Sequence, residues 1–140
     1  MSNIVVPEFA VTDWEASLRF YCDILGFDCL YQRSEEGFAY LEREGAELMI
    51  DQIGLGRTFG DDHLPAAPPF GRGLNLQIRV SAVEPMIAAL EAAHICLYLP
   101  LEEKWYRRGT AEVGQRQFVV ADPDGYLLRF YESLGNRLSG

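Results

Sequence analysis

The first 53 residues change from one hydrophobic period to another, which predicts a helix set between strands. Residues 4–11 are largely apolar, as in a buried strand. The next apolar residues recur at helical spacing, at Trp14, Leu18, Tyr21 and Leu25. Strand-like patterns then follow over residues 27–32, 38–42 and 46–51. This order predicts one βαβββ module.

The second half of the chain repeats this order. A strand pattern over residues 74–80 precedes a helical segment carrying Val83, Ile87 and Leu90. Further strand patterns cover residues 95–99, 115–120 and 126–131. The triplet Cys29-Leu30-Tyr31 also recurs as Cys96-Leu97-Tyr98. A repeat of this kind fixes the architecture, so the fold class predicted is α+β, with two βαβββ modules.

Turn and cap residues stand where these elements should begin and end. Thr12 or Asp13 can cap the first helix, Gly26 can end it, and Ser81 can cap the second helix. Gly45 suits a hairpin turn that needs positive φ. The run Asp122-Pro123-Asp124-Gly125 is typical of a turn between the last two strands.

Strand alternation separates an apolar face from a mixed face in each module. In the first module Leu48 and Ile50 oppose the side chains of Glu47, Met49 and Asp51. In the second, the apolar set alternates with polar residues, namely Asn75, Gln77 and Arg79. The mixed faces favour a cup that holds a ligand, and the alternative is an ordinary solvent-facing sheet.

Residues 54–73 connect the two patterns and are rich in glycine and proline. Such a connection is long for a compact domain. We favour a mobile linker, and the alternative is that Phe59 and Phe70 fold over a site. The prediction is thus a single domain over residues 1–140, with module one at 1–53, the linker at 54–73 and module two at 74–134.

Composition and charge limit the partners. The 140 residues carry a formal net charge of -9, which disfavours nucleic acid and acidic membrane surfaces because both bind through basic side chains. No apolar run is long enough to span a bilayer, and the N-terminal residues do not resemble a secretion signal. The three cysteines lack metal-binding spacing and are expected as small core residues. These features predict a cytoplasmic protein.

Two neighbouring aromatic residues, Trp105 and Tyr106, lie in a charged segment over residues 98–109 that we expect to be irregular. Exposed aromatic rings can stack on flat heteroaromatic ligands or attract cations. Alternatively, Trp105 closes the open end of the sheet or forms a subunit contact. The sequence leaves both interpretations open.

The segment from Val11 to Phe27, the hairpin over residues 37–49 and the run from Gly114 to Phe130 resemble the vicinal-oxygen-chelate superfamily, in particular its glyoxalase/bleomycin resistance group. The resemblance covers nearly the whole chain except residues 54–73. It implies an α+β fold of two βαβββ modules forming curved mixed sheets around a pocket that holds a ligand, and it implies a homodimer.

The resemblance also implies where a metal would lie, because the enzymes of this superfamily hold a divalent metal at four strand positions. Counted from the motifs, these positions fall at Val6, Met49, Asn75 and Arg129. Valine has no donor atom, methionine offers a soft thioether, and arginine repels a cation. We therefore expect no metal and no cofactor.

The leading hypothesis is a non-catalytic protein that binds and sequesters a small, cationic, bleomycin-like molecule and so confers antibiotic resistance. The candidate ligand-binding residues are Glu47, Met49, Asp51, Gln77, Trp105, Tyr106, Glu112 and Arg129. The alternatives are a divergent glyoxalase-like, metal-dependent lyase or dioxygenase, and a scaffold with a filled pocket.

Overall fold

The computed structural model describes residues 2–57, 59 and 62–139. The chain folds as two compact units. The first unit comprises Met1–Arg72 together with Asp122–Tyr126, and the second comprises Gly73–Ala121 and Leu127–Gly140. The turn between the last two strands therefore belongs to the first unit, although the strands themselves belong to the second.

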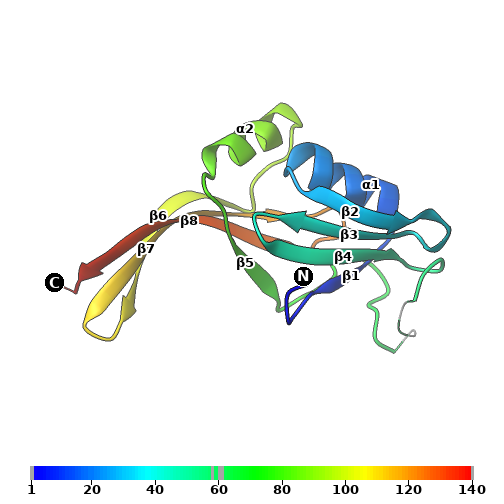
Figure 1. Cartoon of the computed structure of the whole chain (residues 1–140), viewed down its shortest axis with the longest axis horizontal. Helices are drawn as coiled ribbons and strands as arrows, with labels where there is room; N and C mark the ends of the chain where they lie inside the picture. Colours follow the sequence, from blue (N-terminus) through cyan, green and yellow to red (C-terminus); the bar gives the residue numbers. More distant parts are fainter. Residues whose placement is uncertain (1, 58, 60–61, 140) are drawn as a thin grey trace. The chain divides into compact units, whose positions relative to one another are not determined.

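The first unit has a four-stranded mixed sheet in the order β1-β4-β3-β2, with helical segments on one face (Figure 1). Strand β1 runs parallel to β4, and the remaining pairs are antiparallel. Its elements are β1 (Glu8–Val11), α1 (Trp14–Leu18), the π-helix η1 (Arg19–Ile24), β2 (Asp28–Arg33), the 3-10 helix η2 (Ser34–Glu36), β3 (Phe38–Arg43) and β4 (Ala46–Gln52).

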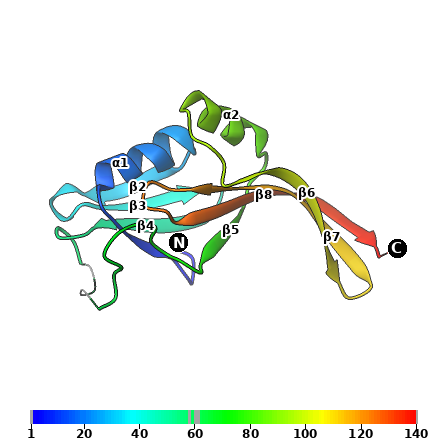
Figure 2. The ribbon, with the colours of Figure 1, turned by 180° about the vertical axis from the view of Figure 1, so that it is seen from behind.

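The second unit repeats this topology, with the strand order β5-β8-β7-β6 and β5 parallel to β8 (Figure 2). Its elements are β5 (Asn75–Arg79), α2 (Glu84–Ala92), β6 (Leu99–Arg108), β7 (Ala111–Ala121) and β8 (Leu127–Leu138). Numbered within each module, both sheets have the order 1-4-3-2. The predicted duplication of a βαβββ unit is confirmed.

Several predicted caps and turns are present. The Asp13 carboxylate accepts hydrogen bonds from the amides of Glu15 and Ala16, which cap α1. Gly45 has a φ of 92° in the β3–β4 hairpin, in the left-handed region that favours glycine. The prediction that Ser81 caps the second helix is wrong, because the N-cap position is Val83. The amide of Val83 is instead satisfied by the Glu132 carboxylate at 3.1 Å.

The segment expected to be irregular is also different in the structure. Strand β6 begins at Leu99, not at residue 95, and continues through Trp105 and Tyr106 to Arg108. Its backbone pairs with β7 over most of its length. This pairing stabilises the strand although the charged residues of the segment have a low intrinsic preference for strands. Likewise, β8 extends to Leu138, well beyond the predicted end at residue 131.

Each unit has its own core on the helix side of its sheet. In the first, Val11, Leu41 and Ile50 are fully buried, as is Tyr21 of η1. In the second, Phe118 and Phe130 stack at 5.6 Å and are fully buried along with Leu90 of α2. The expected alternation of Leu48 and Ile50 against a mixed face is therefore confirmed.

The structure also shows how far the cysteines are buried and whether any helix could cross a membrane. Cys29 and Cys96 are exposed and Cys22 is half-buried, so the expectation of three core cysteines is wrong. Among the described residues, no helix has the length and apolar character needed to cross a membrane.

Candidate ligand-binding site

A cavity of about 440 Å³ lies on the face of the first sheet that the helices leave uncovered. Cross-strand register brings its residues together, because Tyr31 pairs with Tyr40, Tyr40 with Met49, and Met49 with Glu8. Side chains at paired positions share a sheet face. The cavity is therefore built across all four strands of one module.

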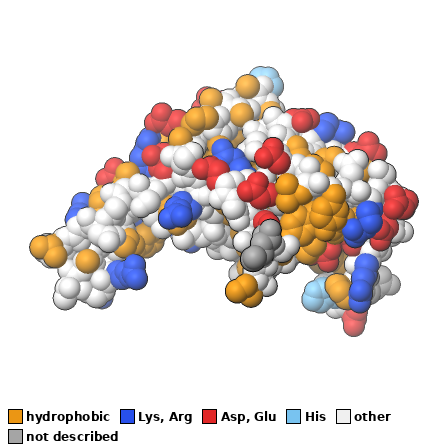
Figure 3. Space-filling model, in the orientation of Figure 1, with side chains coloured by type: hydrophobic (Ala, Val, Ile, Leu, Met, Phe, Trp, Pro, Cys, Tyr) orange, Lys and Arg blue, Asp and Glu red, His pale blue; other side chains and the backbone are white. Residues whose placement is uncertain are grey.

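Aromatic side chains form one wall of this cavity. The rings of Tyr31 and Tyr40 stack with their centroids 5.3 Å apart, and the centroid of the Phe38 ring lies 6.0 Å from that of Tyr31. Hydrophobic side chains gather over β3 and β4 in the space-filling view (Figure 3). Tyr31 remains half exposed, at 50%, so its ring is available to a ligand.

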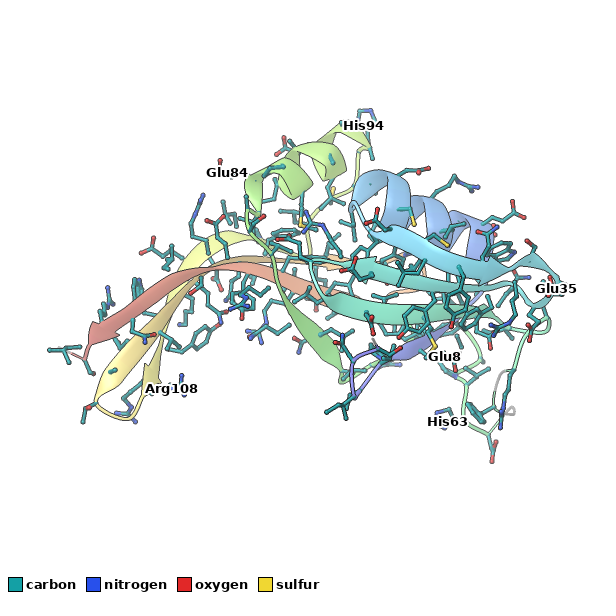
Figure 4. The ribbon with its side chains drawn as sticks, in the orientation of Figure 1. Glu8, Glu35, His63, Glu84, His94 and Arg108 are labelled. Carbon is teal, nitrogen blue, oxygen red and sulfur yellow. The ribbon has the colours of Figure 1, made fainter. Side chains whose placement is uncertain are left out.

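Two carboxylates, Glu8 and Asp51, lie on the same sheet face. Burial raises the pKa of Asp51, and a hydrogen bond from the amide of Arg57 acts in the opposite direction. Partial desolvation, followed by repulsion from Asp51, raises the pKa of Glu8. Glu8 projects from β1 in Figure 4. A cationic ligand would favour the ionised form of both groups.

The loop after β4 closes over this face. A Cβ at Gly56 would lie 1.6 Å from an Asp51 carboxylate oxygen, so only glycine permits this close approach. Arg57 and Phe59 then line the cavity. Of the two alternatives for residues 54–73, Phe59 thus lies at a cavity, whereas Phe70 is buried against Tyr126. Residues 58 and 60–61 are outside the described part of the chain.

Arginine side chains complete the cavity wall. The Arg33 guanidinium lies 4.0 Å from the centroid of the Phe38 ring and pairs with the Glu36 carboxylate. Arg33 and Arg57 lie beside Glu36, Glu8 and Asp51, so the cavity has charges of both signs.

Of the predicted site residues in the first module, Met49 and Asp51 line the cavity. Glu47 lies on the same face but is engaged elsewhere. Its carboxylate accepts hydrogen bonds from the Asn3 amide at 2.7 Å and the Tyr40 hydroxyl at 2.9 Å. These hydrogen bonds lower the pKa of Glu47, the one from Asn3 having the larger effect.

The predicted residues Gln77, Tyr106 and Arg129 come together on the second sheet. Gln77 pairs directly with Arg129 between β5 and β8. The Tyr106 hydroxyl accepts a hydrogen bond from Arg129 Nη1 at 3.3 Å and another from Gln117 Nε2 at 2.7 Å. Sequence reasoning missed Gln117, although strand alternation through β7 could have placed it on this face.

Trp105 and Glu112 form a separate group on that sheet. Adjacent strand residues point to opposite faces, so the rings of Trp105 and Tyr106 are not brought together. Arg137 lies 4.0 Å from the centroid of the Trp105 ring, and its Nε is 2.8 Å from a Glu112 oxygen. Trp105 also packs over Gly114, which has no side chain to obstruct the ring.

A sequence model of the Glyoxalase/Bleomycin resistance protein/Dioxygenase superfamily matches residues 3–130. The chain belongs to this superfamily. It is 25% identical over 135 residues to a bleomycin resistance protein of Geobacillus stearothermophilus, covering 92% of this chain and 96% of that relative. Relatives of the same name in Staphylococcus aureus match equally.

Solved structures share the fold of this superfamily member. TioX from Micromonospora sp. ML1 is 23% identical, with a TM-score of 0.69, and the match covers 94% of this chain and 100% of TioX. TnmS3, an antibiotic binding protein from Streptomyces sp. CB03234, is 24% identical, with a TM-score of 0.59, and the match covers 95% of this chain and 98% of TnmS3. At these identities the likeness shows the fold.

The donor set does not suit the divalent metal of the superfamily's enzymes. Met49 faces Glu8 in the first sheet, and Arg129 faces Gln77 in the second. A thioether and a guanidinium are poor partners for a hard divalent ion. Across the described residues, no cluster of three His, Cys, Asp or Glu side chains could hold a metal. Figure 4 shows His63 in the loop and His94 at the end of α2.

Glu8 lines the cavity but was not among the residues predicted from the sequence motifs. The predicted first-strand position was Val6, but the register places Glu8 beside Met49. Because side chains two apart in a strand share a face, alternation from Val6 would have pointed to Glu8.

Proposed function

We propose that this protein binds and sequesters a small-molecule antibiotic of the bleomycin type, without transforming it, and thereby confers resistance. The observation that carries the proposal is the cavity of about 440 Å³ on the open face of the first sheet. Its volume lies within the range of small-molecule sites. The name of the bleomycin resistance relatives, at 25% identity, supports the same ligand class.

The cavity combines two features that suit a flat, positively charged ligand. The half-exposed Tyr31 ring, backed by Tyr40 and Phe38, offers a stacking surface. Glu8 and Asp51 provide negative charge on the same face, and the net charge of -9 adds long-range attraction for cations. Phe59, exposed at 59%, can pack against the ligand from the loop side.

The proposal includes a cytoplasmic location and a homodimer, both implied by the resemblance to bleomycin resistance proteins. Sedimentation equilibrium of the purified protein at micromolar concentration tests the dimer. A monomer under these conditions would contradict that part of the proposal alone.

Calorimetric titration with metal-free and copper-loaded bleomycin tests the binding function. We expect saturable binding that Phe59→Ala weakens by roughly tenfold, since an aromatic contact of about 1.4 kcal/mol is lost. Tyr98→Ala is the matched control, because Tyr98 is 69% exposed on the second unit and does not line the cavity. It should leave the affinity unchanged.

The absence of saturable heat with either form of bleomycin would overturn the drug-specific proposal. Metal analysis addresses the lyase or dioxygenase alternative. Stoichiometric nickel, zinc, manganese or iron, together with an activity that a chelator abolishes, would favour the enzyme.

A further inference from the structure

The lining of the first unit's cavity includes two arginines whose charges are engaged differently. The guanidinium of Arg33 pairs with the Glu36 carboxylate and lies over the Phe38 ring. Arg57 is exposed in the loop after β4, and it forms no direct ion pair with any carboxylate in the described part of the chain. Its positive charge therefore acts on the cavity without being committed to one partner.

The backbone of this loop fixes the position of Arg57. The amide of Gly56 donates to the Gln52 carbonyl at 3.0 Å, and the amide of Arg57 donates to the Asp51 carboxylate. A Cβ at Gly56 would lie 1.6 Å from an Asp51 oxygen and 2.7 Å from the Glu36 carbonyl oxygen, so the chain is tightly packed here. The Arg57 side chain thus starts directly beside one of the cavity carboxylates.

The guanidinium of Arg57 lies among the groups that the proposed ligand would use. Its central carbon is 5.9 Å from the centroid of the Phe59 ring. Partial burial raises the pKa of Glu8, and repulsion from Asp51 raises it further, whereas the positive charge of Arg57 lowers it. The backbone of Arg57 therefore serves Asp51, and its side-chain charge acts on Glu8. A guanidinium is itself a flat cation that stacks on aromatic rings.

We propose that Arg57 is an internal competitor for the ligand, because its guanidinium takes the place beside Glu8 and Phe59 that a flat cation would take. This inference rests on the proposed binding function and concerns the same cavity. A bound cation must either displace the guanidinium or share the site with a like charge, and both weaken its binding. The cavity therefore selects cations that gain more from Glu8 and the aromatic wall than Arg57 does. Neutral ligands do not meet this competition.

Calorimetric titration of the full chain with benzamidine, a flat aromatic molecule with one positive charge, tests the inference. Arg57→Gln should bind benzamidine about three- to fivefold more tightly than the parent protein at low ionic strength, since an exposed like charge is removed. Arg57→Lys keeps a positive charge and should show a smaller gain. For benzamide, which has the same shape without the charge, Arg57→Gln should bring no gain.

Two further variants separate local competition from general electrostatic attraction. Arg19→Gln is the matched control, because Arg19 is exposed on η1, outside the cavity lining, and its loss changes the net charge equally. It should alter the benzamidine affinity by less than about 1.5-fold. In a protein that already carries Glu8→Gln, the gain from Arg57→Gln should largely disappear, because the carboxylate for which the two cations compete is absent.

An NMR titration of the Glu8 side-chain carboxyl gives a readout that needs no ligand. Loss of the Arg57 charge should raise the pKa of Glu8 in Arg57→Gln, whereas Arg19→Gln should leave this pKa unchanged. An unchanged Glu8 pKa in Arg57→Gln would overturn the inference.

The affinities can contradict the inference as well. Benzamidine binding that is absent, or no tighter in Arg57→Gln than in the parent protein, would overturn it, and so would an equal gain in Arg19→Gln. A weaker affinity in Arg57→Gln would show that Arg57 holds the ligand. If bleomycin does not bind but the benzamidine results are as expected, only the drug-specific function fails.

Discussion

The hydroxyl of Tyr21 donates a hydrogen bond of 2.7 Å to Oδ2 of Asp122, a residue 101 positions later in the chain. Both side chains are buried. The other carboxylate oxygen, Oδ1, accepts from the amides of Asp124 at 2.9 Å and Tyr126 at 3.0 Å. Asp122 thus shapes the turn that joins β7 to β8 and fastens it to the helical segment of the first unit.

Removal of the Tyr21 hydroxyl should destabilise the protein without disturbing its packing. In Tyr21→Phe the Asp122 carboxylate loses a buried donor, so we expect the free energy of unfolding to fall by about 1–3 kcal/mol. Urea denaturation measures this loss. Tyr98→Phe removes an exposed hydroxyl and should change stability by less than about 0.5 kcal/mol. Equal effects would show that the buried hydrogen bond contributes nothing.

Stability should fall as the pH rises through the range in which Asp122 ionises. Burial raises the pKa of Asp122 from 3.8 to about 6, against the effect of the Tyr21 hydrogen bond. Between these values the folded state binds more protons than the unfolded chain. The stabilisation is therefore complete below pH 4 and lost as the pH approaches 6, by roughly 3 kcal/mol.

Asp122→Asn should remove this dependence while keeping a side chain of the same shape. Unfolding free energies measured from pH 4 to pH 7 should show a shallower decline in the variant than in the parent protein. Parallel curves would show that another group is responsible.

A methyl group at Gly114 should displace Trp105. The added Cβ would lie 2.6 Å from the Trp105 ring, closer than carbon atoms pack. We expect Gly114→Ala to lower stability by about 1–3 kcal/mol and to change the fluorescence of Trp105. The same substitution made together with Trp105→Phe provides the control, because the remaining Trp14 should then report no change.

Affinity for a cationic ligand should increase with pH in the range where the cavity carboxylates ionise. Partial burial and the nearby Asp51 raise the pKa of Glu8, and burial raises that of Asp51. Bleomycin titrations at a series of pH values should therefore show tighter binding as these groups lose their protons. Glu8→Gln should flatten the profile, whereas Glu15→Gln, on α1 away from the cavity, should leave it unchanged.

The sequence by itself determined the duplicated fold. Helical spacing at Trp14 and Tyr21, alternation at Leu48 and Ile50, and the turn at Gly45 are all local signals. They depend on side chains a few residues apart, whose geometry is set by the helix and strand periods. For this reason the two βαβββ modules could be predicted, and Met49 and Asp51 could be placed on one sheet face.

Tertiary structure decided which residues meet at each site. Glu8 joins Met49 through parallel pairing, and Phe59 reaches the cavity because Gly56 lies against Asp51. On the second sheet, the pairing of β6 with β7 separates Trp105 from Tyr106. Strand register and loop closure depend on contacts between distant segments, and local patterns do not encode them. The cavity and the Arg129 group therefore became visible only in the folded chain.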